Sequence, residues 1–203
     1  ATLAAHGRTA QGVDWKDAAG QALRHRQFLR LVEGDPEASV LDLGCGYGDF
    51  LAFLRAQGHR GRYLGLDLAP AMLDAARRLH GEGPGHAFRL GATPPALADY
   101  AIASGVLNVR RGAEVAAWAA HVEATIETLA RASRRGFGFN MLSLHSDPAR
   151  RRADLHYADP VAMLAAMLAR HGRHVALLQD YGLWEFTLLV RHAGSHTASP
   201  TPL

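Results

Sequence analysis

The sequence predicts a doubly wound α/β fold, in which helices cover both faces of an open and mostly parallel sheet. Three observations predict it. A short apolar strand at residues 40–43 leads into a turn with glycine at every second position and then into a helical pattern. A second strand ends in an acid, Asp67, which lies 19 residues after Gly48. Short apolar runs then alternate with helical patterns until two final strands pair.

The glycine-rich turn lies within residues 39–50, which read SVLDLGCGYGDF. The run VLDL at 40–43 has the short apolar pattern of a strand covered on both faces. Glycine can adopt positive φ, and it lets the backbone approach a ligand closely because it has no Cβ. Large apolar residues follow with helical spacing over 50–54, and Gly58 lies where that helix is expected to stop. The segment is typical of the first strand–turn–helix unit of a nucleotide-binding sheet.

An acid two residues before the first glycine distinguishes two classes of nucleotide ligand. A dinucleotide site uses G-x-G-x-x-G, with backbone N–H groups on a pyrophosphate. Here the pattern is Asp42-x-Gly44-x-Gly46-x-Gly48. A carboxylate at this position would repel a pyrophosphate, but it can accept hydrogen bonds from an ammonium group. The pattern therefore favours a ligand with an ammonium group over a dinucleotide. The alternative is that the segment is only a tight turn between a strand and a helix and binds no ligand.

Composition bounds the class of protein. The 203 residues are 48% hydrophobic and 20% charged, which fits one globular domain with a full core. No apolar run is long enough to span a bilayer and the start has no secretory h-region, so a cytoplasmic location is expected. The single cysteine, Cys45, excludes an internal disulfide and a cysteine-built metal site. The formal charge is only +3; the arginine run at 150–152 is predicted to be a solvated loop, with contact to an anionic substrate as the alternative.

The N-terminal region is predicted to contain a loose arm and then a helix. Residues 1–13 are polar and aperiodic, which indicates the arm. The helix is expected from Asp14, its N-cap, to the turn at residues 34–36. Gln21 and Arg24 are three residues apart on this helix, so they share a face, and the apolar stripe lies elsewhere.

The rest of the chain alternates between strand and helix patterns. Further strands are expected at 62–67, 86–90, 99–104, 137–142, 174–178 and 184–190. Further helices are expected from Pro70 to Gly81, over 115–129, and from the Asp159-Pro160 N-cap to Gly172. The short link between the last two strands contains Gly182, which predicts an antiparallel hairpin. Residues 193–203 are small, polar and proline-bearing, and are expected to form a disordered tail.

The acid and the three glycines resemble the first motif of class I S-adenosylmethionine-dependent methyltransferases, whose ligand has a cationic amino-acid tail and no phosphate. The order of strand–helix units with a terminal hairpin also resembles this family's plan, over roughly residues 14–192. The resemblance implies a single methyltransferase domain with a Rossmann-like seven-stranded sheet, the last strand antiparallel and helices on both faces. Segments including 12–15, 139–140 and 157–160 are similar to a bacterial branch of small-molecule methyltransferases.

The resemblance implies S-adenosylmethionine as the cofactor and S-adenosylhomocysteine as its product. Asp67 is expected to accept hydrogen bonds from ribose hydroxyls, with an N-cap of the helix at Pro70 as its alternative role. Arg24 is expected to meet the cofactor's carboxylate, for which a planar guanidinium is suited, and a solvated helix face is the alternative. Ala92 replaces the acid that many of these enzymes place at the adenine, which leaves backbone groups or Thr93 for that role. The full predicted cofactor set is Asp42, Gly44, Cys45, Gly46, Gly48, Asp67, Leu68, Met72, Ala92, Thr93, Ser104, Gln21 and Arg24.

The reacting methyl group is expected above the ends of the first, fourth and fifth strands. Trp15 and Asn140 are predicted to contact the substrate, and His145, Asn108 and Tyr157 are predicted to be catalytic. Histidine has an ordinary pKa of about 6.5, which suits proton transfer at neutral pH, and a surface histidine is the alternative. Asn108 and Asn140 end apolar runs, so they either orient a substrate or tie loops together.

The resemblance implies methyl transfer to a small-molecule nucleophile, such as a hydroxyl group or an amine. The reaction is a direct displacement at a sulfonium methyl, so the protein mainly aligns the nucleophile, and no metal is expected. The run at 104–108, SGVLN, differs from the Asn/Asp-Pro-Pro-aromatic run of enzymes that methylate nucleic-acid bases. Neither a nucleic-acid nor a membrane partner is therefore expected. The alternatives are a non-catalytic methyltransferase-like binding module and, less favoured by the glycine spacing, a nicotinamide-dependent oxidoreductase.

Overall fold

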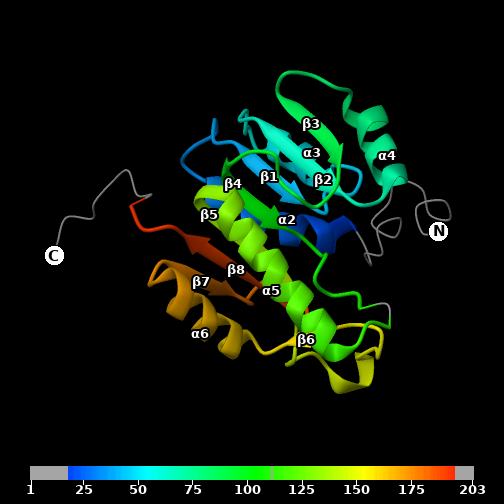
Figure 1. Ribbon diagram of the computed structural model, residues 1–203, viewed down its shortest axis with the longest axis vertical. Coiled ribbons are helices and arrows are strands. Elements are labelled where there is room, and N and C mark those ends of the chain that lie inside the picture. Colours follow the sequence, from blue (N-terminus) through cyan, green and yellow to red (C-terminus); the bar gives the residue numbers. More distant parts are fainter. Residues whose placement is uncertain (1–17, 111, 195–203) are drawn as a thin grey trace.

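A computed structural model describes residues 18–110 and 112–194 of the chain (Figure 1). The predicted arm at 1–13, the N-cap Asp14, Trp15 and the tail from residue 195 lie outside the described residues. The helices are α2 (Ala18–Val32), α3 (Asp49–Ala56), α4 (Pro70–His80), α5 (Val115–Ala132), α6 (Pro160–His171) and the short 3-10 helix η2 (Pro148–Arg150). The strands are β1 (Val40–Leu43), β2 (Tyr63–Asp67), β3 (His86–Leu90), β4 (Ala98–Ala103), β5 (Ser133–Ser143), β6 (Tyr157–Ala158), β7 (Val175–Leu178) and β8 (Glu185–Arg191).

The strands form one sheet in the order β3-β2-β1-β4-β5-β8-β7, and β6 pairs with the end of β5. Strands β1 to β5 pair in parallel, whereas β8 is antiparallel to both β5 and β7. The predicted mostly parallel sheet with its last strand antiparallel is therefore confirmed. The expectation was wrong in one respect: residues 157–158 form an eighth strand instead of a loop, because two residues are too few to show an alternating pattern.

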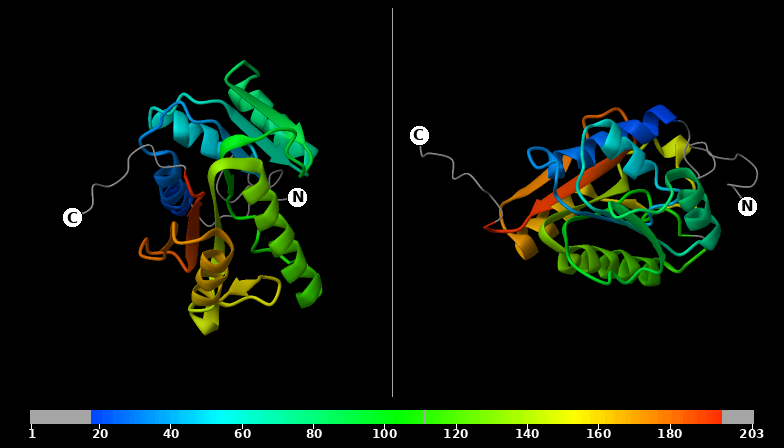
Figure 2. Two further views of the ribbon diagram at one scale, coloured as in Figure 1. Left: turned by 60° about the vertical axis from the view of Figure 1, so that its left-hand side comes forward. Right: turned by 90° about the horizontal axis from the view of Figure 1, so that it is seen from above.

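Helices cover both faces of the sheet (Figure 2). On one face, Leu129 of α5 and Met167 of α6 belong to a core that includes Phe139 of β5. On the other, Phe28 of α2 and residues of α3 and α4 share a second core with Tyr100 of β4. Successive residues of β4 alternate between these two cores, as the pleat of a strand requires. A strand buried on both faces explains the continuous apolar runs in the sequence.

The connection from β3 to β4 contains no helix, since residues 91–97 form a loop. In Figure 1, α5 lies across β4 and β5, while loops alone border β1, β2 and β3 on that side. This connection distinguishes the structure from an even alternation of strands and helices.

Strand β5 begins at Ser133, earlier than the predicted residue 137, and directly follows α5. The sequence pattern did not predict these additional strand residues, because they include Arg134 and Arg135 and charged residues are unusual in a buried strand. At the sheet end, Arg135 pairs with Asp35, and Arg134 Nη1 lies 3.6 Å from Asp99 Oδ1.

The predicted N-cap of α6 is confirmed: the Asp159 carboxylate accepts from two backbone N–H groups, at 2.8 and 3.2 Å.

Candidate active site

The glycine turn after β1 is fastened to the end of β2. Positive φ angles of 80°, 56° and 80° occur at Gly44, Gly46 and Gly48. The backbone N–H groups of Gly44 and Cys45 both donate to the carbonyl of Leu66, at 2.7 and 3.0 Å. A Cβ on Gly44 would lie 2.1 Å from Cγ1 of Val106, in the loop after β4. The turn therefore needs glycine for its conformation and for this close approach.

Asp42 is a buried carboxyl group at the carboxyl end of β1, and it is 2% exposed. Its Oδ2 accepts a hydrogen bond of 2.6 Å from the Tyr63 hydroxyl. Its Oδ1 has no donor among the described residues. Burial raises the pKa of Asp42 to about 7; the bond from Tyr63 opposes this rise, and the charge of Asp67 adds to it. A cationic donor at Oδ1 would stabilise the carboxylate and lower this pKa.

Ser104 places a second unpartnered oxygen beside Asp42. Its Oγ is buried and has no hydrogen-bond partner in the described part of the chain. In the parallel pairing of β1 with β4, Asp42 lies opposite Ile102. Ser104 therefore follows two residues later on the same face, because side chains alternate along a strand. Since buried polar atoms are normally hydrogen-bonded, these two oxygens indicate a place for a polar ligand.

Asp67, at the carboxyl end of β2, closes the same site. Its Oδ2 accepts from the Gly46 backbone N–H and its Oδ1 from the Ala69 N–H, each at 2.8 Å. The alternative role as an N-cap is wrong, because the N-cap of α4 is Ala69. Each carboxylate oxygen retains acceptor capacity for a ligand hydroxyl.

A buried charge network joins α2 to β8 near this site. Arg24 Nε lies 2.7 Å from Oε2 of Glu185, whose side chain is 1% exposed. The Tyr181 hydroxyl is 3.5 Å from Oε1 of Glu185, and Asn140 of β5 is close enough to oppose the rise in the pKa of this carboxyl group. Asn140 Oδ1 in turn accepts from the Gly105 N–H at 2.7 Å. Burial raises the pKa of Glu185, and the charge of Arg24 opposes this rise.

The face of α2 that carries Gln21 and His25 is buried. Gln21 is 5% exposed, and its side chain hydrogen-bonds Tyr47 in the glycine turn. The His25 ring lies 5.1 and 5.4 Å from the ring centroids of Phe50 and Phe53. Burial, and to a smaller extent the charge of Arg24, lowers the pKa of His25 to about 3, so this ring is neutral at pH 7. The alternative of a solvated helix face is therefore wrong for Gln21 and for Arg24, whose guanidinium pairs with Glu185, while their cofactor roles stay predictions.

Known proteins share this architecture and much of this sequence. A family model described as a methyltransferase domain matches residues 41–134. A protein of Mycobacterium tuberculosis, Rv1506c, is named as a methyltransferase and is 47% identical to this chain over 166 residues. The match covers 81% of this chain and 99% of Rv1506c. The chain belongs to the class I S-adenosylmethionine-dependent methyltransferases.

Two more distant matches share part of the sequence or the fold of this methyltransferase. Over 60 residues, it is 42% identical to the 18S rRNA (guanine-N(7))-methyltransferase of Mus musculus, covering 30% of this chain and 20% of that one. The crystal structure of magnesium protoporphyrin IX methyltransferase from Synechocystis PCC 6803, with bound S-adenosylhomocysteine, superposes with a TM-score of 0.66. The two share 15% identity, with 86% of this chain and 84% of that chain covered.

The outer predicted cofactor residues of the methyltransferase lie around the ends of β2 and β3. Leu68 is 73% exposed directly after Asp67, and Met72 is half-buried on α4. Ala92 and Thr93 are exposed, in a loop that is tied to β2 where the Gly91 N–H donates to the Asp67 carbonyl at 2.9 Å. Cofactor roles at these positions stay predictions. Cys45 is buried, and burial raises the pKa of its thiol, so it is not a reactive thiolate.

Asn108 and Asn140 tie loops together. Asn108 Oδ1 accepts from the Leu142 N–H at 2.9 Å, and its backbone carbonyl accepts from the His156 N–H at 2.7 Å. Asn140 Oδ1 is engaged with the loop after β4, as described above. The loop-tying alternative is therefore confirmed for both side-chain oxygens, and their substrate and catalytic roles stay predictions.

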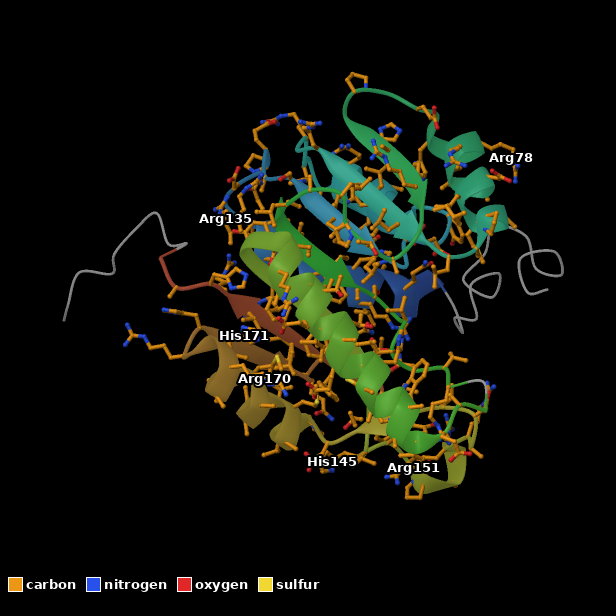
Figure 3. The ribbon with its side chains drawn as sticks, viewed as in Figure 1. Arg78, Arg135, His145, Arg151, Arg170 and His171 are labelled. Atoms are coloured by element: carbon orange, nitrogen blue, oxygen red, sulfur yellow. The ribbon has the colours of Figure 1, made fainter. Side chains whose placement is uncertain are left out.

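His145 and Tyr157 lie on the segment that follows β5. His145 is exposed, and Figure 3 places it at the lower edge of the molecule. The Tyr157 hydroxyl accepts from the Arg152 N–H at 3.1 Å, and the Arg151 guanidinium lies 5.8 Å from its ring centroid. The arginine run at 150–152 is exposed, as predicted for a solvated loop. Catalytic roles for both residues stay predictions.

Sequence reasoning assigned no role to Glu185 or Tyr181. One signal was present: Glu185 is a lone acid at the start of the apolar run FTLLV, where a strand enters the core. A charge at such a position needs a partner.

Among the described residues, no group of three His, Cys, Asp or Glu side chains is arranged to hold a metal ion. No helix within 18–110 or 112–194 is long and apolar enough to cross a bilayer.

Proposed function

We propose that this methyltransferase binds S-adenosylmethionine at the carboxyl ends of β1, β2 and β4 and methylates a small-molecule nucleophile there. One observation carries the cofactor site. Asp42 and Ser104 direct unpartnered buried oxygens to the same face beside the glycine turn. Open α/β sheets bind their ligands at this edge. The acceptors suit a cationic amino-acid tail, since a carboxylate can accept from an ammonium group.

Each residue near the turn then has a defined task. The Asp42 carboxylate accepts from the ammonium group, and Asp67 accepts from the ribose hydroxyls while the Gly46 N–H holds its orientation. Exposed Leu68 supplies an apolar surface for the adenine. When bound, S-adenosylmethionine supplies an electrophilic methyl group on its sulfonium. The chain aligns the nucleophile in line with that methyl group.

Three features support a small-molecule substrate. All the described strands belong to one sheet, with no appended unit for a macromolecule in the described ranges. The superposed Synechocystis enzyme is named for a small-molecule substrate, magnesium protoporphyrin IX. The match to the rRNA enzyme covers only 20% of that protein. A cytoplasmic location also stays a prediction.

Calorimetry with S-adenosylhomocysteine tests the cofactor site. We expect Asp67→Ala to weaken binding at least tenfold, because it removes the acceptors for the ribose hydroxyls. Asp74→Ala is the matched control, since this acid lies on α4 and pairs with Arg77 at 3.3 Å. If folded Asp67→Ala binds as tightly as the parent, the ribose role is wrong.

Transfer of labelled methyl groups tests the substrate class. The protein is incubated with labelled S-adenosylmethionine and either pooled metabolites or total RNA, and we expect label in the metabolites. Label in RNA would contradict the proposal, and cofactor binding without transfer to either pool would indicate a binding module. With a substrate in hand, His145→Ala and Tyr157→Phe should lower turnover and spare S-adenosylhomocysteine binding. Parental turnover in both variants would leave alignment alone as the mechanism.

A further inference from the structure

A cleft of about 700 Å³ lies on the sheet face that α5 only partly covers. It is bordered by the connection into β3 at residues 83–85 and by residues 95–97 of the loop before β4. The first residues of β1, β2 and β3 line it, so it lies at the amino ends of these strands. The glycine turn follows the carboxyl end of β1, and the cleft is therefore separate from the cofactor site. It exists because no helix forms between β3 and β4.

The floor of the cleft is an apolar row across three neighbouring strands. Leu41 pairs with Leu64, and Leu64 pairs with Ala87, so the three side chains lie side by side on one face. Leu41 is fully buried, whereas Leu64 and Ala87 are half-buried. Leu97, in the bordering loop, is 50% exposed. The row spans two interstrand spacings, about 10 Å, and the cleft volume falls within the range of about 300–1,000 Å³ for small-molecule sites.

The charged groups that line the cleft are all basic. They are Arg62, Arg89 and Arg134, and no Asp or Glu lines the cleft. Arg134 lies 3.6 Å from an oxygen of Asp99, whereas Arg62 and Arg89 have no carboxylate partner among the described residues. Arg62 precedes Leu64 by two residues and Arg89 follows Ala87 by two, so both project on the face of the apolar row. They lie on the two sides of the row, about 13 Å apart along the strands.

We propose that this cleft is a second ligand site, which takes an amphiphilic organic anion. The apolar body of the ligand lies on Leu64 and Ala87, the half-buried residues of the floor, and its anionic head is held at one side of the row by the guanidinium group of Arg62 or of Arg89. Charge complementarity selects the anion, because a guanidinium binds carboxylate, sulfonate or phosphate oxygens through paired N–H donors. The apolar floor is only about 10 Å wide, so it suits a small molecule better than the surface of a folded protein. The site is independent of methyl transfer.

Fluorescence titration with 8-anilinonaphthalene-1-sulfonate tests the proposal on the full chain. Excess S-adenosylhomocysteine is added to occupy the cofactor site. We expect saturable binding of one probe per chain, and displacement by decanoate at a concentration at least tenfold below that needed with 1-decanol. Equal displacement by the acid and the alcohol would overturn the proposal, because the arginines would then play no part.

Matched variants locate the probe. The double variant Arg62→Gln with Arg89→Gln should weaken binding of the probe and of decanoate at least tenfold. The control, Arg60→Gln with Arg78→Gln, removes the same charge from exposed positions outside the cleft and should bind as the parent does. Ala87→Leu should block the probe by filling the floor, with circular dichroism to verify folding. Parental binding in the double variant or in folded Ala87→Leu would overturn the proposal, as would equal loss in the control.

Discussion

The substitution Asp42→Asn should abolish a loss of stability that the parent undergoes between about pH 4 and pH 7, and it should weaken cofactor binding. Burial raises the pKa of Asp42 to about 7, from about 3.9 in an unfolded chain. Between these values the folded carboxyl group holds a proton that the unfolded one has lost. The stability it contributes is therefore complete below about pH 4, falls as the pH rises towards 7, and is constant above that. Asparagine has a similar shape and no such dependence.

The magnitude follows from the pKa difference. From pH 5 to pH 8, the free energy of unfolding of the variant should rise relative to the parent by about 3 kcal/mol, at about 1.4 kcal/mol for each pH unit up to 7. This change is independent of any penalty for burying the new amide, because that penalty is the same at both pH values. Urea unfolding followed by circular dichroism at pH 5 and pH 8 measures it. Asp74→Asn is the control, since it makes the same change at an exposed position on α4.

The same carboxyl group should make cofactor binding pH-dependent in the parent. Only the ionised form accepts from an ammonium group, and its fraction rises from about 0.1 at pH 6 to about 0.9 at pH 8, so affinity for S-adenosylhomocysteine should rise about tenfold. Asp42→Asn should bind weakly at both pH values. A stability difference that does not change with pH would refute the reasoning about burial, and unchanged affinity in the variant would refute the role of the carboxylate.

Three other substitutions have defined outcomes. Arg24→Ala leaves the buried carboxylate of Glu185 without its guanidinium, so the free energy of unfolding should fall by about 3 kcal/mol at pH 7. Thermal melts at pH 7 should show a loss of about 6–12 °C. The loss should shrink as the pH is lowered, because burial raises the pKa of Glu185 and a protonated carboxyl group needs no guanidinium partner; a loss that does not change with pH would contradict this. Gly44→Ala should destabilise the protein more than Gly58→Ala does. Both glycines have a φ of 80°, but only the Cβ added at position 44 would clash with a side chain. Equal midpoints of chemical denaturation for the two variants would show that the clash is absent. His145→Ala should change stability by less than about 0.5 kcal/mol because the side chain is exposed, so a large drop in melting temperature would assign it a structural role.

Features that depend on neighbouring residues were predictable from the sequence. The Asp159-Pro160 start of α6 and the limits of β3 need only capping chemistry and short apolar patterns. The glycine turn was likewise predictable, since three positive φ angles require glycine. The acids at the ends of β1 and β2 followed from where the strands stop.

Features that join distant segments were not predictable in this way. Arg24 and Glu185 are 161 residues apart, so their pairing depends on β8 lying beside β5 under α2. Pattern alone placed Arg24 on a polar helix face, but not against a carboxylate. The same limit applies to the state of Asp42, because its raised pKa depends on the burial that the assembled sheet and Tyr63 produce.

The position of β8 in the sheet has a consequence for synthesis of the chain. This strand pairs with β5 on one side and β7 on the other, yet it is the last of the described strands along the chain. While residues 144–184 are being added at the ribosome, the long strand β5 has an open edge on that side, with apolar residues that include Phe137 and Met141. An open edge of this kind can pair with another chain. Completion of residues 185–191 closes it, so a nascent chain stalled before Glu185 should need a chaperone to remain monomeric.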